Sequence, residues 1–121
     1  MKDEPQERRC FGVLVDNEAG VLARVIGLFS GRGYNIDSLT VTEVDAEKET
    51  SRITVVTTGT PQILEQIKAE LDRIVPVQKV VDMTSELDAV ERELALVKVH
   101  CTGDKRIESL RVSEAFRARV I

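Results

Sequence analysis

The hydrophobic pattern of residues 10–83 alternates between short apolar runs and stretches of helical period, and this alternation limits the possible folds more than any other feature. Short apolar or alternating runs are typical of strands, whereas apolar residues that recur at helical spacing are typical of amphipathic helices. Strand-like runs occupy 10–15, 35–44, 51–58 and 77–83, and a helix-like stretch follows the first and the third of them. The order βαββαβ predicts a ferredoxin-like α+β fold, in which two helices cover one face of a four-stranded antiparallel sheet.

Both predicted helices have local signals at their ends. The apolar stripe of the first helix consists of Val21, Leu22, Val25, Ile26 and Phe29. Gly33, which follows that stripe, suits the left-handed position that commonly ends a helix. Thr60 and Pro61 favour the start of the second helix, because threonine can cap and proline is preorganised for the first helical position. We expect this helix to end before Pro76.

A change of composition after Met83 predicts a domain boundary. Residues 85–93 are acidic and only weakly periodic, which is typical of a linker or a short helix. The apolar run 94–101 predicts a fifth strand, and residues 104–118 predict a third helix. We therefore expect an N-terminal tail (1–8), the βαββαβ domain (9–84), a linker (85–93) and an incomplete C-terminal domain of one strand and one helix (94–121).

Composition and charge argue against several classes of protein. The chain has 21 acidic and 17 basic residues and a formal net charge of −4, which disfavours nucleic acid as a partner. No apolar run approaches the roughly 20 residues that a membrane helix needs, and no hydrophobic segment follows the N-terminus, so we expect neither membrane association nor export. Two cysteines, Cys10 and Cys101, are too few for a disulfide framework and indicate a reducing cytoplasm. His100 is the single histidine, so we expect no metal site.

The sequence contains no recognisable catalytic constellation. Nucleophilic catalysis needs a nucleophile with a base in reach, and no serine or cysteine motif accompanies His100. The glycines of residues 31–33 follow a predicted helix rather than a strand, so they do not have the context of a dinucleotide-binding fingerprint. We therefore expect a protein that binds rather than catalyses.

The junction between the first predicted strand and the first predicted helix is a candidate ligand site. Helix N-termini present unpaired N–H groups and a positive dipole end, so the backbone of Gly20, Val21 and Leu22 can hold a carboxylate. Gly20 has no side chain to block the approach. Asn17 adds an acceptor and two donors that suit an α-amino or α-carboxyl group. The alternative interpretation is that Asn17 only makes a turn and that Gly20 only relieves backbone strain.

A second candidate region follows the first predicted helix. Asn35 and Ile36 lie where the next predicted strand begins. A sheet edge placed beside a second subunit would let these two residues complete a pocket across the interface. Alternatively, Asn35 simply satisfies backbone groups of the turn. We expect a homodimer in which the sheets of two copies lie side by side.

One long segment, residues 16–41, resembles the regulatory small subunit of bacterial acetohydroxyacid synthase (acetolactate synthase). Residues 64–67 and 90–99 are similar to it as well, so the resemblance covers nearly everything after Arg8. It implies an N-terminal ACT domain, an amino-acid sensor with the same βαββαβ order that the periodicity predicts. Members of this family usually continue through a complete second domain, whereas this sequence ends after its first predicted strand and helix.

The resemblance also implies a function. The family binds valine at a paired ACT interface, which gives feedback control, and it stimulates the large catalytic subunit in branched-chain amino acid biosynthesis. The thiamine diphosphate, FAD and magnesium are implied for that large subunit, and no cofactor is implied for this chain, which would be a non-catalytic subunit. The implied valine-site residues are Asn17, Gly20, Val21, Leu22, Asn35 and Ile36.

Three alternatives share the predicted fold. The first is an ACT amino-acid-sensing module of another metabolic enzyme or of a transcriptional regulator. The second is an acylphosphatase-like hydrolase, which would need a basic residue in the first strand-to-helix loop, and residues 16–20 contain none. The third is an RNA-binding module with aromatic residues on its strands, and residues 39–44 and 52–58 contain none.

Overall fold

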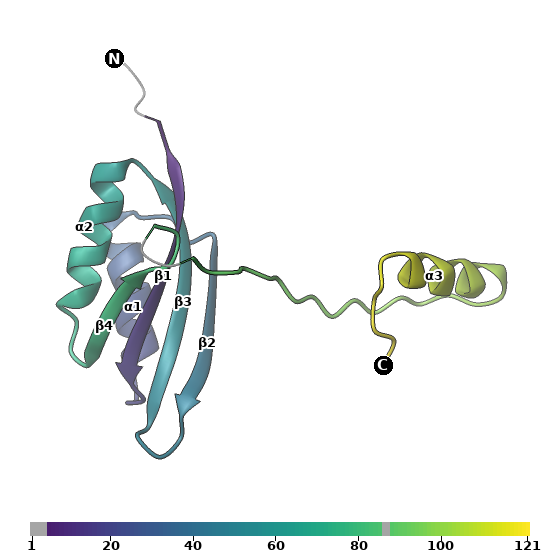
Figure 1. Cartoon of the computed structure of the whole chain (residues 1–121), viewed down its shortest axis with the longest axis horizontal. Helices are drawn as coiled ribbons and strands as arrows, with labels where there is room; N and C mark the ends of the chain where they lie inside the picture. Colours follow the sequence, from purple (N-terminus) through teal and green to yellow (C-terminus); the bar gives the residue numbers. More distant parts are fainter. Residues whose placement is uncertain (1–4, 86–87) are drawn as a thin grey trace. The chain divides into compact units, whose positions relative to one another are not determined.

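The computed structural model describes residues 5–85 and 88–121 of the chain (Figure 1). These residues form two compact units, which divide between Val90 and Glu91. The predicted tail at 1–8 and the predicted linker at 85–93 each lie partly outside the described residues. Each unit is described below by itself.

The first unit contains the predicted βαββαβ order. Its elements are β1 (Glu7–Asp16), α1 (Val21–Arg32), β2 (Ser38–Asp45), β3 (Thr50–Gly59), α2 (Pro61–Asp72) and β4 (Val77–Asp82). Thr60 caps α2 as predicted, because its side chain accepts a hydrogen bond from the backbone N–H of Ile63. β1 begins inside the predicted tail, at Glu7, because the end of β3 provides a partner for each of its first residues.

The four strands form one antiparallel sheet in the order β2-β3-β1-β4. The two central strands, β3 and β1, contain most of the buried strand residues, and β2 and β4 form the edges. Both helices pack on the same face (Figure 1), because their buried residues share one cluster with alternate residues of β1 and β3. That cluster consists of Phe11, Val13, Val15, Val21, Val25, Phe29, Ile53, Val55, Leu64, Ile67, Leu71 and Val80. The α+β ferredoxin-like prediction is confirmed.

The edge strand β2 is only partly buried. Leu39 and Val41 are two residues apart and so share one face of the strand, but only Leu39 packs against the core, whereas Val41 is 47% exposed. Val44 is exposed to the same degree. The reason is position in the sheet: β2 has only one strand beside it, so a regular alternation is not enough to bury its side chains. The strand therefore offers both backbone groups and apolar side chains along its outer edge.

A buried ion pair fixes the chain where β4 ends. The Asp82 side chain is 2% exposed, and its Oδ2 lies 2.9 Å from Nη1 of Arg9 on β1. Its Oδ1 accepts hydrogen bonds from the backbone N–H groups of Thr84 and Ser85. Burial disfavours the carboxylate, but the hydrogen bonds from Ser85, Thr84 and Arg9 outweigh this effect and hold the pKa of Asp82 below its ordinary value.

The second unit contains one helix, α3 (Asp104–Ala115), and the predicted fifth strand is wrong. Residues 94–101, all of them described, form neither helix nor strand. A strand needs a neighbour for its backbone groups, and within the described residues the apolar run has none. Its hydrophobic side chains are correspondingly exposed: Leu94 87%, Leu96 80%, Val97 79% and Val99 60%. α3 likewise buries no residue.

Candidate ligand-binding site

The loop between β1 and α1 is held by backbone hydrogen bonds from two neighbouring segments. The N–H of Asp16 donates to the carbonyl of Pro76, and the N–H of Asn17 donates to the carbonyl of Glu49 over 2.7 Å. Glu49 belongs to the turn between β2 and β3, so this loop lies at the hairpin end of the sheet. The Asn17 side chain itself is exposed.

Gly20 takes the position immediately before α1 in a left-handed conformation, with φ 84° and ψ −2°. Within the described residues no side chain caps this helix, so its first turn has no capping hydroxyl or carboxylate there. Apart from its chain neighbours, no heavy atom of the described residues would lie within 4 Å of a Cβ at Gly20, which leaves room beside the helix terminus. These features suit a small anion, and a carboxylate in particular.

The residues that follow Gly20 divide between the core and the surface. Val21 is 7% exposed and belongs to the core cluster, and its backbone N–H donates to the carbonyl of Glu18 over 3.3 Å, so neither its side chain nor its N–H is open to a ligand. Leu22 is 37% exposed, and Ile26, one turn further along α1, is 39% exposed. The N-terminal half of α1 thus presents an apolar surface next to the polar loop.

The second predicted region lies beyond the other end of α1. Asn35 is exposed, while Ile36 is half-buried and packs against the core. The backbone carbonyl of Asn35 accepts a hydrogen bond from the hydroxyl of Thr57, and its side-chain amide donates to Asp37. The strand begins only at Ser38, three residues later than predicted, because residues 33–37 form the turn that leads out of the helix.

The structure does not bring the two predicted regions together within one chain. They flank α1, which has 12 residues and is therefore about 18 Å long. Figure 1 shows this helix running along the sheet. A single ligand the size of an amino acid cannot bridge that length. The six predicted residues therefore lie in two groups, one at each end of the helix, and these groups are called half-sites below.

The turn at 33–37 is fixed by groups that sequence analysis did not select. Tyr34 packs edge-on against Phe29, with ring centroids 6.1 Å apart. Partial burial, together with the nearby carboxylate of Glu70, raises the pKa of Tyr34. The side chain of Asp37 contacts that of Asn35. The only signal for this contact in the sequence is the separation of two residues, since side chains two residues apart lie on the same side of an extended segment.

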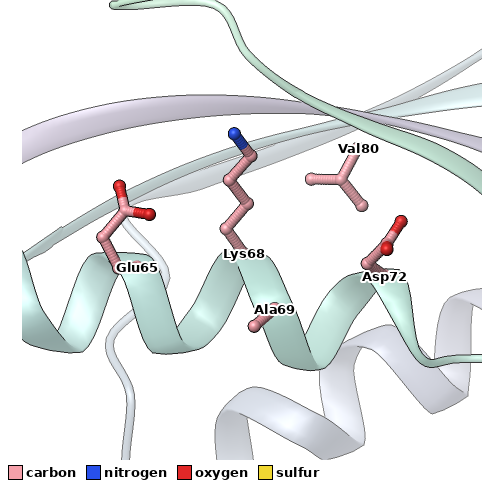
Figure 2. A pocket seen from close by; sticks show the side chains of 5 residues that line it. All are labelled: Glu65, Lys68, Ala69, Asp72 and Val80. Carbon is pink, nitrogen blue, oxygen red and sulfur yellow. The ribbon is translucent and has the colours of Figure 1, made fainter.

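A shallow hollow of about 260 Å³ lies between α2 and the edge strand β4. Figure 2 shows Glu65, Lys68 and Asp72 along α2, with Val80 of β4 beside them. It contains none of the predicted site residues, and β4 is at the opposite edge of the sheet from β2. Its alternating charges are typical of a solvated helix face.

Two further findings concern the described residues only. Within 5–85 and 88–121, no group of three histidine, cysteine or acidic residues is placed to hold a metal ion. In the same residues, no helix combines the length and apolar character required to span a bilayer.

Family comparisons distinguish between the alternatives that share this fold. The family described as the AHAS small subunit-like ACT domain matches residues 11–79, and the family described as the small subunit of acetolactate synthase matches residues 92–121. The chain belongs to the acetolactate synthase small-subunit family. The first unit is therefore an ACT domain.

Individual relatives agree with this assignment. The chain is 45% identical over 114 residues to the acetolactate synthase small subunit of Haemophilus influenzae, covering 94% of this chain and 69% of that protein. It is 46% identical to the acetolactate synthase isozyme 3 small subunit of Escherichia coli, with the same coverage. The crystal structure of the Thermotoga maritima small subunit superposes with a TM-score of 0.81 at 37% identity, covering 95% of this chain and 71% of that one.

Proposed function

We propose that this chain is the regulatory subunit of acetolactate synthase and binds valine between two copies of its ACT unit. Binding there gives feedback control, and the subunit also stimulates the large catalytic subunit in branched-chain amino acid biosynthesis. The observation that carries the proposal is the separation of the two half-sites by the length of α1. Two half-sites that cannot meet in one chain can meet in a symmetric pair of chains.

The edge strand β2 provides the contact that would bring them together. β2 begins just after Asn35 and ends at the hairpin whose Glu49 holds the loop of Asn17. A two-fold axis that pairs two β2 strands antiparallel places the start of one strand beside the end of the other. Asn35 and Ile36 of one copy then approach the Gly20 end of α1 in the second copy.

Exposed apolar side chains support the same arrangement. Val41 and Val44 lie exposed on β2, and Leu22 and Ile26 lie exposed on α1. Pairing two edges would shield the unsatisfied strand groups and bury these side chains. We expect a dimer by sedimentation at tens of micromolar, and we expect Val41→Lys to shift it towards monomer. Val75→Lys is the matched control, because Val75 is 76% exposed in a turn away from β2. A wild-type monomer with and without valine would contradict the pairing.

The surroundings of the site favour a small aliphatic amino acid. Leu22 and Ile36 offer apolar walls, and the terminus of α1 offers N–H donors for the carboxylate. Calorimetric titration with each of the twenty amino acids tests this. Valine should give the strongest signal, with leucine or isoleucine next, since hydrophobic pockets separate such side chains by only ~1–3 kcal/mol. A stronger response to serine, glycine or an aromatic amino acid would contradict valine as the ligand.

The proposed partner performs the chemistry. Thiamine diphosphate, FAD and magnesium are assigned to the large catalytic subunit, and none to this chain. The purified chain should form no acetolactate from pyruvate, should raise the rate of the catalytic subunit when mixed with it, and should make that rate sensitive to valine. Turnover by the chain alone would overturn the assignment. Cys10 and Cys101 are not joined in a disulfide, and two cysteines are too few for a disulfide framework, which is typical of the cytoplasmic location proposed here.

A further inference from the structure

Asp37 is connected to the predicted site through Asn35. Oδ1 of Asp37 accepts a hydrogen bond from Nδ2 of Asn35, and Oδ2 accepts one from the Thr58 hydroxyl at 2.6 Å. The backbone is fixed as well, because the N–H of Asp37 donates to the carbonyl of Val56 and the carbonyl of Asn35 accepts from Thr57. The Asp37 carboxylate and the Asn35 amide are therefore held in one orientation by β3.

This contact decides which end of the Asn35 amide faces a ligand. A carboxylate only accepts hydrogen bonds, so the group turned towards Asp37 must be the NH₂ of the amide. The carbonyl Oδ1 of Asn35 is consequently the end of the amide that is turned away from Asp37. Asp37 takes up one of the two N–H groups of this amide, and the lone pairs of Oδ1 make an N–H donor such as an ammonium a complementary ligand group.

The negative charge of the Asp37 carboxylate also favours a ligand ammonium. A ligand nitrogen bound to Oδ1 of Asn35 lies within about 6 Å of the Asp37 carboxylate, a separation at which opposite charges attract appreciably near a protein surface. Asn35, Asp37 and Thr58 border a hollow of about 530 Å³, whose lining also includes Ile63 and Ile67 of α2, so there is space beside these polar groups. The helix terminus at Gly20 of the other copy would meanwhile hold the ligand carboxylate.

We propose that Asp37 is a specificity-determining residue that makes the site select α-amino acids over the 2-oxo acids of the same carbon skeleton. This inference rests on the proposed function. A 2-oxo acid has the carboxylate and the aliphatic side chain, but a carbonyl oxygen replaces the ammonium. That oxygen cannot donate a hydrogen bond to Oδ1 of Asn35, and its partial negative charge is repelled by the carboxylate of Asp37.

The test compares two ligands on matched variants of the full chain. Valine and 3-methyl-2-oxobutanoate are titrated calorimetrically into the wild type, Asp37→Asn and Asp72→Asn. Asp72→Asn is the control, because it removes the same charge from an exposed position on α2 beside the hollow of Figure 2. Thermal unfolding monitors the fold of each variant. Thr58→Val keeps the charge of Asp37 and removes only its hydroxyl donor.

We expect the wild type to prefer valine, and Asp37→Asn to weaken valine binding about tenfold without weakening the 2-oxo acid. Thr58→Val should weaken valine binding less than Asp37→Asn does, and Asp72→Asn should leave both affinities unchanged. An equal loss for both ligands in Asp37→Asn would show a purely structural role and overturn the inference, as would an unchanged preference. A wild type that binds no valine would instead overturn the proposed function, and the inference with it.

Discussion

Substitution of Gly20 separates the ligand role of the α1 terminus from its structural role. Asp and Asn have nearly the same shape, and both tolerate the left-handed conformation better than other side chains do. Either residue at φ 84° should therefore cost a similar amount of stability, on the order of 1 kcal/mol. The open space around the Gly20 Cβ position accepts both side chains without a clash. The two variants then differ in charge alone.

The difference in binding follows from that charge. Gly20→Asp would place a carboxylate where the ligand carboxylate is proposed to bind. Two like charges about 4 Å apart repel by about 1 kcal/mol in water and by about 4 kcal/mol near a protein surface. The variant also neutralises part of the helix dipole, which contributes roughly 0.3–1 kcal/mol. Valine binding by Gly20→Asp should therefore be weaker than by Gly20→Asn by a factor between about ten and a few thousand.

Calorimetric titration of both variants with valine measures this ratio, and urea unfolding measures their stabilities. Comparable free energies of unfolding are the condition for attributing the difference to the ligand. Equal valine affinities of Gly20→Asp and Gly20→Asn would refute the reasoning, because they would show that no ligand carboxylate approaches this helix terminus.

Three further predictions concern the site, the buried ion pair and the second unit. Asn17→Ala and Asn35→Ala should each weaken valine binding by roughly 1–3 kcal/mol in calorimetric titrations. Unchanged affinity in both variants would show that the two side chains only stabilise turns. Despite burial, hydrogen bonds hold the pKa of Asp82 below its ordinary value, so its contribution to stability is complete above about pH 4 and is lost as the pH falls through the lowered pKa. Asp82→Asn should lower the free energy of unfolding at neutral pH by ~1–3 kcal/mol and reduce its fall in acid, and an unchanged pH profile in urea unfolding would contradict this. Amide hydrogen exchange should be slow over residues 10–83 and faster from Asp104 onward, with protection of 94–101 that rises with protein concentration; slow exchange throughout, unaffected by dilution, would contradict an open second unit.

The local pattern of the sequence was sufficient to predict the elements of the ACT unit. Helix and strand patterns depend on neighbouring residues, so the apolar stripe on α1, the Thr60 cap and the short apolar run of β1 can be recognised without tertiary information. The same kind of local pattern wrongly predicted a strand at residues 94–101. A strand also needs a pairing partner, and the sequence of the run does not specify one. Exposure on β2 was unpredictable for a related reason, since alternation does not say whether a strand is central or at an edge.

The arrangement of the proposed site depended on tertiary structure. Sequence analysis selected Asn17, Gly20 and Asn35 from their positions beside a predicted helix. The folded chain places the two proposed half-sites at opposite ends of α1 and places β2 at an edge of the sheet, where a second copy can pair with it. The Asp37 carboxylate accepts a hydrogen bond from the hydroxyl of Thr58, 21 residues further along the chain. Side-chain chemistry and local period are properties of the sequence itself. Strand pairing decides which donors meet which acceptors. It joins segments that lie far apart along the chain, and a local sequence pattern does not indicate which segments pair.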